Sequence, residues 1–208
     1  QKQGSYVGGL FVFESKLTQE FRLHFDEKIA EMFQSIGIRE GSVWIEVFHD
    51  GENYYFNEVG FRYGGSVSIY PVDYFYQINQ VAADIHYALT GESCISEHTS
   101  LIRSTLPRKK YYCIYPVHIN AGTISSISGL DKIAQLENIV YLATTKYLHD
   151  RIESSGSFSQ VFALVHFVCN TTEECIQTID RIHQMLVVFD EHGNNMVNRM
   201  LDVGKIIF

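Results

Sequence analysis

The 208-residue chain can bury a substantial core as one large domain or two small ones, and its hydrophobic fraction of 46% is ordinary for a globular protein. Its 24 acidic and 16 basic residues give a net charge of −8, which argues against nucleic-acid and anionic-membrane binding because both need a basic face. The sequence has no run of 18 apolar residues and no N-terminal signal pattern. We therefore expect a cytoplasmic protein.

Four cysteines, Cys94, Cys113, Cys169 and Cys175, show neither a C-x-x-C pair nor a zinc-site spacing. This favours incidental thiols in a reduced protein, although oxidative pairing stays open. The sequence also has no P-loop, no G-x-G-x-x-G, no G-x-S-x-G and no H-E-x-x-H. Because the chain begins at Gln1 rather than Met, we expect a fragment of a longer protein.

The first predicted elements are a strand over residues 6–14, which contains Gly8-Gly9, and an amphipathic helix over residues 23–36, which ends at Gly37. Two runs dense in β-branched and aromatic residues follow, over residues 43–48 and 54–59. The turn-forming residues between them predict a β-hairpin.

Each strand of this hairpin carries one acid, Glu46 and Glu58. A two-residue turn would set Glu46 opposite Tyr55 and place Glu58 on the other face. A three-residue loop over residues 51–53 would set Glu46 directly opposite Glu58. In that register both carboxylates share a face with four aromatic residues, namely Trp44, Phe48, Tyr54 and Phe56.

Acids within apolar strands are costly to bury, so they either face solvent or pair with a cation. In the structural interpretation, Glu46 and Glu58 lie on a face that is solvated or paired with an arginine. The functional one is a site for Mg²⁺ with bound phosphate, because two facing carboxylates repel unless a positive charge lies between them.

Glu46, Glu58, Arg62 and the following Gly64-Gly65-Ser66 resemble the end of the catalytic core of ATP-grasp ligases, a superfamily that includes biotin carboxylase, D-alanine–D-alanine ligase and carbamoyl-phosphate synthase. The similarity is closest to the carbamoyl-phosphate-synthase-like branch. The superfamily's usual motif is Glu-x-Asn-x-Arg, and Gly60 stands here in the place of Asn.

The resemblance implies an ATP- and Mg²⁺-dependent ligase that joins a carboxylate to an amine or thiol through an acyl phosphate. Glu46 and Glu58 would bind Mg²⁺ and ATP, Arg62 would be catalytic, and Gly64, Gly65 and Ser66 would bind substrate. The implied partners are small molecules and the missing N-terminal half of the same protein, and a homodimer is compatible with the sequence. The alternative is a non-catalytic binding or regulatory module in which Gly60 marks a lost metal site.

Downstream, a helix is predicted over residues 73–90 with Asp73 as its cap, followed by a polar stretch over residues 92–107 that suggests a domain boundary. The expected fold is α+β: an ATP-grasp C-terminal subdomain, with an antiparallel sheet and helices, over residues 1–105, and a smaller strand-rich α+β domain over 106–208. Its expected elements are strands 111–119, 139–145 and 160–168, a turn at 122–124, and helices 130–136 and 171–186. A capping box, Thr171 with Glu174, predicts the start of the last helix.

Overall fold

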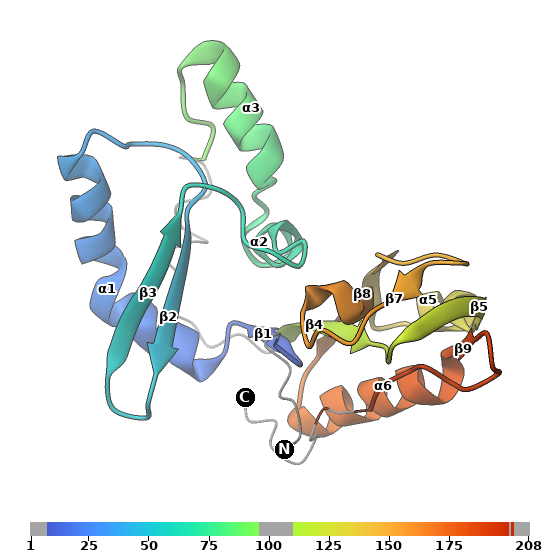
Figure 1. The fold of residues 1–208 in the computed structure, drawn as a ribbon. Helices are drawn as coiled ribbons and strands as arrows, with labels where there is room; N and C mark the ends of the chain where they lie inside the picture. Colours follow the sequence, from blue (N-terminus) through green and yellow to red (C-terminus); the bar gives the residue numbers. More distant parts are fainter. Residues whose placement is uncertain (1–7, 96–109, 200, 202–208) are drawn as a thin grey trace. The chain divides into compact units, whose positions relative to one another are not determined.

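The computed structural model describes residues 8–95, 110–199 and 201. These residues form two compact units (Figure 1). One unit comprises residues 17–95, and the other comprises residues 8–16 together with those from 110 onward. Among the described helices, none combines the length and the apolar character needed to cross a membrane.

The unit of residues 17–95 contains a hairpin and three helices. Its elements are α1 (Lys16–Ser35), β2 (Trp44–His49), β3 (Tyr54–Gly60), α2 (Ile69–Tyr76) and α3 (Gln80–Thr90). The predicted hairpin is confirmed, and α1 begins seven residues earlier than predicted, at Lys16 rather than residue 23. Phe21 and Phe25 of α1 contact the rings of Tyr54 and Phe56 at centroid distances of 5.3–5.8 Å, which fixes the helix against the hairpin.

The single helix predicted over residues 73–90 is wrong, because the chain forms α2 and α3 with a break between them. Gln77 ends α2 in the left-handed conformation, with φ of 57°. Asn79 then caps α3 by accepting a hydrogen bond from the Ala82 amide at 3.0 Å. Asp73 is not a cap: it lies inside α2, where its carbonyl accepts from the Gln77 amide.

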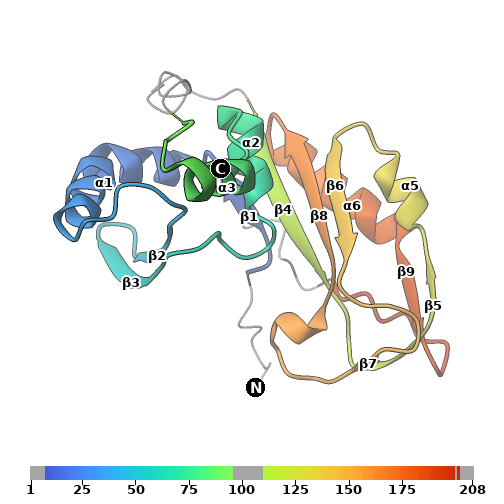
Figure 2. The same ribbon diagram turned by 90° about the horizontal axis from the view of Figure 1, so that it is seen from above.

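The second unit is built on antiparallel strands. A four-stranded sheet has the order β1-β4-β8-β6, with β1 (Phe11–Phe13), β4 (Tyr111–His118), β8 (Val161–Cys169) and β6 (Ile139–Thr144). A three-stranded sheet has the order β7-β5-β9, with β7 (Arg151–Ile152), β5 (Gly122–Ser128) and β9 (Val187–Asp190). Figure 2 shows β4, β8 and β6 side by side.

Two α-helices, α5 (Leu130–Ala134) and α6 (Thr172–Met185), and a short 3-10 helix, η2 (Phe158–Gln160), complete this unit. Helix α6 lies along one face of the four-stranded sheet (Figure 1), where Ile179 and Ile182 are fully buried with Phe162 and Phe167 of β8. The predicted cap is confirmed, since the Thr171 side chain accepts from the Glu174 amide at 3.2 Å. The unit's core therefore lies between α6 and the sheet.

The predicted α+β class, with antiparallel sheets and helices, is confirmed. The turn predicted at residues 122–124 is wrong, because these residues begin β5, and β7 and β9 were not predicted. Most of the polar stretch 92–107 lies outside the described residues. The division at residue 105 into two parts stays a prediction, although β1 pairs with β4.

Candidate functional site

Glu46 and Glu58 lie directly opposite each other in the β2–β3 ladder. Directly paired residues of antiparallel strands project to the same face, so the two carboxylates share one side of the hairpin, as the three-residue-loop register predicts. The loop itself differs from both alternatives. His49 pairs with Tyr54, which leaves four residues between the strands, and a register shift after Glu46 restores the acid pair.

This register shift is a β-bulge that makes Asn57 the extra residue of β3, because Val47 pairs with Phe56 and Glu46 with Glu58. The three-residue loop over residues 51–53 is therefore wrong, and the bulge supplies the one-residue offset instead. No loop-based argument from the sequence could find it, because bulges have only a weak local signal.

The four-residue loop is held by the carboxylate of Asp50. Its Oδ1 accepts hydrogen bonds from the backbone amides of Asn53 at 2.8 Å and Glu52 at 3.0 Å, and its Oδ2 accepts from the Tyr55 hydroxyl at 2.9 Å. These hydrogen bonds lower the pKa of Asp50 to about 2. The bond from the Asn53 amide has the largest effect, and those from the Glu52 amide and the Tyr55 hydroxyl have smaller ones. The loop is thus fixed by a carboxylate that stays ionised at neutral pH.

The bulge also changes which aromatic residues accompany the acids. Trp44 and Phe48 alternate with Glu46 along β2, so they share its face as predicted. Tyr54 and Phe56 instead pair with His49 and Val47, and their rings contact α1. Their predicted place beside the carboxylates is therefore wrong: they form the opposite, helix-facing side of the hairpin.

Asn57 was missed as a site residue. Its Nδ2 donates to Glu46 Oε2 at 3.1 Å, which places a side-chain amide beside the acid pair. Two carboxylates and one amide on a partly exposed face are hard oxygen donors of the kind that Mg²⁺ takes in proteins, so the side chains fit this ion.

Arg62 follows the last residue of β3 and lies near Glu58. Its guanidinium lies over the Trp44 ring, 4.9 Å from the centroid, and its Nη1 donates to the Tyr63 carbonyl at 2.9 Å. Its Nη2 is 4.0 Å from Glu58 Oε1, and both side chains are about half exposed, at 54% and 55%. An ion pair so long and so exposed contributes little, so Trp44 is the firmer contact.

Gly60, which stands in the place of the superfamily's Asn, pairs with Trp44 across the hairpin. A Cβ atom at this position would lie 3.3 Å from Arg62 Nε and 3.4 Å from Arg62 Cγ. These are tight contacts, so a side chain here would compete with Arg62 for the space over Trp44. The glycine therefore gives the arginine room to cross the strand end.

The predicted substrate-binding residues follow in a loop. At Gly64 a Cβ would lie 2.9 Å from Trp44 Cδ1 and 2.5 Å from Ser68 Oγ, whereas Gly65 has open space around it. Ser66 is left-handed, with φ of 58°. In the described part of the chain, no acceptor takes the amide protons of Gly64, Gly65 or Ser66, which leaves them free for an anionic group.

A pocket of about 460 Å³ adjoins Arg62 and lies between the hairpin end and α3. Within it Asp84 accepts hydrogen bonds from the Tyr63 hydroxyl at 2.7 Å and from the Ser42 hydroxyl at 3.1 Å. The bond to Asp84 raises the pKa of Tyr63. The pocket's lining is Glu40, Gly41, Ser42, Phe61, Arg62, Tyr63, Asp84 and Tyr87.

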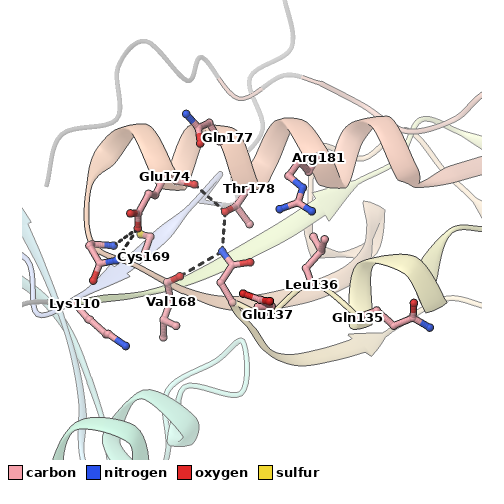
Figure 3. Close-up of a pocket in the computed structure, with 12 residues that line it drawn as sticks. Lys110, Gln135, Leu136, Glu137, Val168, Cys169, Glu174, Gln177, Thr178 and Arg181 are labelled. Atoms are coloured by element: carbon pink, nitrogen blue, oxygen red, sulfur yellow. Dashed lines mark hydrogen bonds between the residues drawn. The ribbon is translucent and has the colours of Figure 1, made fainter.

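A larger pocket, of about 740 Å³, lies in the other unit between the start of α6, the end of β8 and the residues before β6 (Figure 3). Asn138 spans it, donating to Thr178 Oγ1 at 2.8 Å and to the Val168 carbonyl at 3.4 Å. None of the site residues predicted from sequence lines this pocket.

No protein-family model matches the sequence, and no curated protein matches it either. Solved structures do match. An L-amino acid ligase from Bacillus licheniformis superposes with a TM-score of 0.71 at 21% identity, over 89% of this chain and 45% of that chain. A phosphoribosylglycinamide synthetase from Anaerococcus prevotii gives 0.70 at 13% identity, over 90% and 48%.

A third match is the biotin carboxylase domain of the Hydrogenobacter thermophilus 2-oxoglutarate carboxylase, solved with MgADP, ADP and bicarbonate. Its TM-score is 0.65 at 14% identity, over 94% of this chain and 41% of that one. These proteins are ATP-grasp ligases. The chain has part of the ATP-grasp ligase fold. It spans less than half the length of each of these three chains, so the likeness concerns only a portion of the ATP-grasp fold.

Proposed function

We propose that the chain forms the closing part of the nucleotide site of an ATP- and Mg²⁺-dependent carboxylate–amine or carboxylate–thiol ligase. The observation that carries the proposal is the direct pairing of Glu46 with Glu58, with Arg62 beside them, in a chain with an ATP-grasp fold. The biotin carboxylase domain similar to this chain was solved with MgADP, which supports the choice of ligand.

In this proposal Glu46 and Glu58 hold the Mg²⁺, and Asn57 orients Glu46 through its amide. The bound ion would neutralise charge on the phosphate oxygens of ATP. Arg62, kept in place by Trp44, adds a fixed positive charge where the transferring phosphoryl group gains negative charge. The free amides of Gly64, Gly65 and Ser66 would bind an oxygen of the anionic substrate.

The chemistry is a two-step transfer. A substrate carboxylate oxygen attacks the γ-phosphorus of ATP, and ADP leaves, which forms an acyl phosphate. An amine or thiol then attacks the acyl carbon, loses its proton, and displaces inorganic phosphate. Both steps place negative charge on oxygens, so the cationic and amide groups of this loop suit them. The pattern Glu-x-Gly-x-Arg-x-Gly-Gly over residues 58–65 is the feature that favours the carbamoyl-phosphate-synthase-like branch.

The remainder of the active site would come from the preceding part of the same protein. The hairpin and α1 expose a set of large apolar side chains, and an apolar pocket of about 470 Å³ lies between them. Surfaces of this kind mark places where another part of a protein packs. The exposed residues are Leu23, Met32, Ile36, Phe56 and Val59. Because half a cleft does not exclude water from phosphates, we propose that this chain alone is inactive.

One observation favours the alternative, a non-catalytic module derived from this fold. Gly60 supplies no ligand, and Arg62 occupies the space above Trp44 where a side chain at position 60 would lie. Hydroxylamine separates the two functions, because it converts an acyl phosphate to a stable hydroxamate. With ATP, Mg²⁺ and a panel of small carboxylates, the complete protein should form a hydroxamate with at least one acid and release phosphate in equal amount. ATP binding without hydroxamate or phosphate release would favour the module.

A further inference from the structure

Three cysteines that are far apart in the sequence meet in the unit containing α6. Cys113 lies on β4, Cys169 is the last residue of β8, and Cys175 lies in the first turn of α6. Their sulfur atoms are all within 4.8 Å of one another, and those of Cys113 and Cys169 are 3.7 Å apart. All three side chains are buried. Two strands and a helix thus hold three thiols at fixed positions.

The spacing suits a single metal ion. Metal–thiolate bonds are about 2.3 Å long, so three sulfurs arranged trigonally around one ion are about 4 Å apart. A disulfide between Cys113 and Cys169 fits less well. Cys113 pairs with Phe167 and Tyr111 with Cys169, so the two cysteines are diagonal neighbours, whose Cα atoms are typically about 7–8 Å apart. Bridged cysteines rarely exceed about 7 Å.

The donor set identifies the class of ion. Among the described residues no histidine or carboxylate joins the three thiols in one ligand group, and all three belong to the apolar core. Thiolate donors select soft ions such as Cu(I) and Zn(II). Zn(II) in structural sites takes four ligands, and the described part of the chain supplies only three. A site of three sulfurs is therefore matched best by Cu(I), a soft ion that accepts three ligands.

The start of α6 lies at the cluster. Cys175 belongs to the first turn of α6, where its amide donates to the Thr171 carbonyl at 3.1 Å, and the helix N-terminus stabilises negative charge. Cys169 lines the 740 Å³ pocket with Asn170 and Glu174 (Figure 3), which gives an ion a route to the cluster.

We propose that Cys113, Cys169 and Cys175 form a trigonal three-sulfur site that binds one Cu(I) ion with release of thiol protons. The site is separate from the hairpin acids and does not depend on nucleotide binding. The fourth cysteine, Cys94, is exposed and belongs to the other unit, so it provides a matched control.

The test is an anaerobic titration of the purified chain with Cu(I) against a chromophoric Cu(I) chelator. We expect one Cu(I) per chain in the wild type and in Cys94→Ala. Cys169→Ala and Cys175→Ala should bind at least about tenfold more weakly, because loss of a supporting group alone typically costs that much. Equal affinity in all four proteins, or a loss confined to Cys94→Ala, would overturn the proposal.

Two measurements on the wild type alone keep the proposal testable if the variants do not fold. X-ray absorption of the Cu(I)-loaded chain should show three sulfur neighbours at about 2.3 Å. Cu(I) should also raise the melting temperature, because it binds the assembled cluster more tightly than the separated thiols of the unfolded chain. Two sulfur neighbours, no change in melting temperature, or preferential binding of Zn(II) from an equimolar mixture would overturn the assignment.

Discussion

The side-chain amide of Asn57 donates to Glu46 Oε2 at 3.1 Å, because a bulge turns this residue onto the acid-bearing face of the hairpin. In the proposed site this contact orients one Mg²⁺-binding carboxylate. We therefore expect Asn57→Ala to raise the Mg²⁺ concentration needed for half-maximal ATP turnover in the complete protein by about tenfold, the effect of losing a group that orients a ligand.

Asn57→Asp should act in the opposite direction and lower the Mg²⁺ requirement, because it adds a third carboxylate oxygen donor beside the acid pair. Asn53→Ala is the control, since only the backbone of Asn53 is bound in the loop. Mg²⁺ titrations of phosphate release check all three variants. An unchanged Mg²⁺ requirement in both Asn57 variants would show that the amide has no part in ion binding.

Trp44 is the only tryptophan of the chain, so its fluorescence reports on the Arg62 guanidinium 4.9 Å from its ring. Gly60→Asn should displace Arg62 from the ring, because a Cβ at position 60 comes within 3.3 Å of Arg62 Nε. We expect Gly60→Asn and Arg62→Ala to change the emission spectrum in the same way.

Gly60→Asn also adds the oxygen ligand that is usual in the superfamily, so the complete protein should then need less Mg²⁺. We expect the wild type to hold one Mg²⁺ firmly and a second weakly. A wild-type spectrum in Gly60→Asn would contradict the account of the arginine, and loss of the fold would mean that Gly60 is a backbone requirement.

Buried histidine should make the α6 unit sensitive to acid. His183 Nε2 lies 2.6 Å from the Tyr115 hydroxyl. Burial lowers the pKa of His183, and the positive charge of the nearby Arg199 lowers it further. The unfolded chain then takes up this proton at a higher pH than the folded chain does. Stability should therefore fall as the pH drops below about 6.5, and keep falling until the folded histidine is itself protonated.

Thermal unfolding at about pH 8 and about pH 5.5 checks this, because the ordinary histidine pKa lies between them. His183→Gln should reduce the loss of stability on acidification without removing it, since burial also lowers the pKa of His118. The same loss in wild type and His183→Gln would assign the pH dependence to other groups.

The isolated chain should fold but bind ATP weakly, because it provides one wall of the proposed nucleotide cleft. Calorimetric titration with ATP and Mg²⁺ should give weak or undetectable binding to the chain and clear binding to the complete protein. Micromolar affinity of the chain alone would mean that the nucleotide site lies elsewhere, and the roles of Glu46 and Glu58 would then need revision.

Much of this fold could be predicted from periodicity and turn residues. The hairpin, α1 and α6 follow hydrophobic patterns, and the Thr171 cap marks where α6 begins. The break between α2 and α3 was not predicted, because apolar residues continue on both sides of Gln77. The left-handed conformation of Gln77 is not typical of a glutamine, so the residue type does not indicate it.

The candidate site could likewise be predicted only in part from the sequence. The facing of Glu46 and Glu58 could be proposed from the motif, but the actual offset comes from the bulge at Asn57 and not from the loop. The gathering of Cys113, Cys169 and Cys175 could not be proposed, because it depends on how β4, β8 and α6 pack. A local bulge decided the first outcome, and long-range packing decided the second.

The most direct test of the central claim compares Glu58→Gln with Glu52→Gln in the complete protein. Both changes remove one charge from the hairpin, but Glu52 lies in the exposed loop, whereas Glu58 faces Glu46. We expect Glu58→Gln to lower ATP turnover about 100-fold or more with an unchanged fold, and Glu52→Gln to behave as wild type. Wild-type turnover in a folded Glu58→Gln would contradict the account.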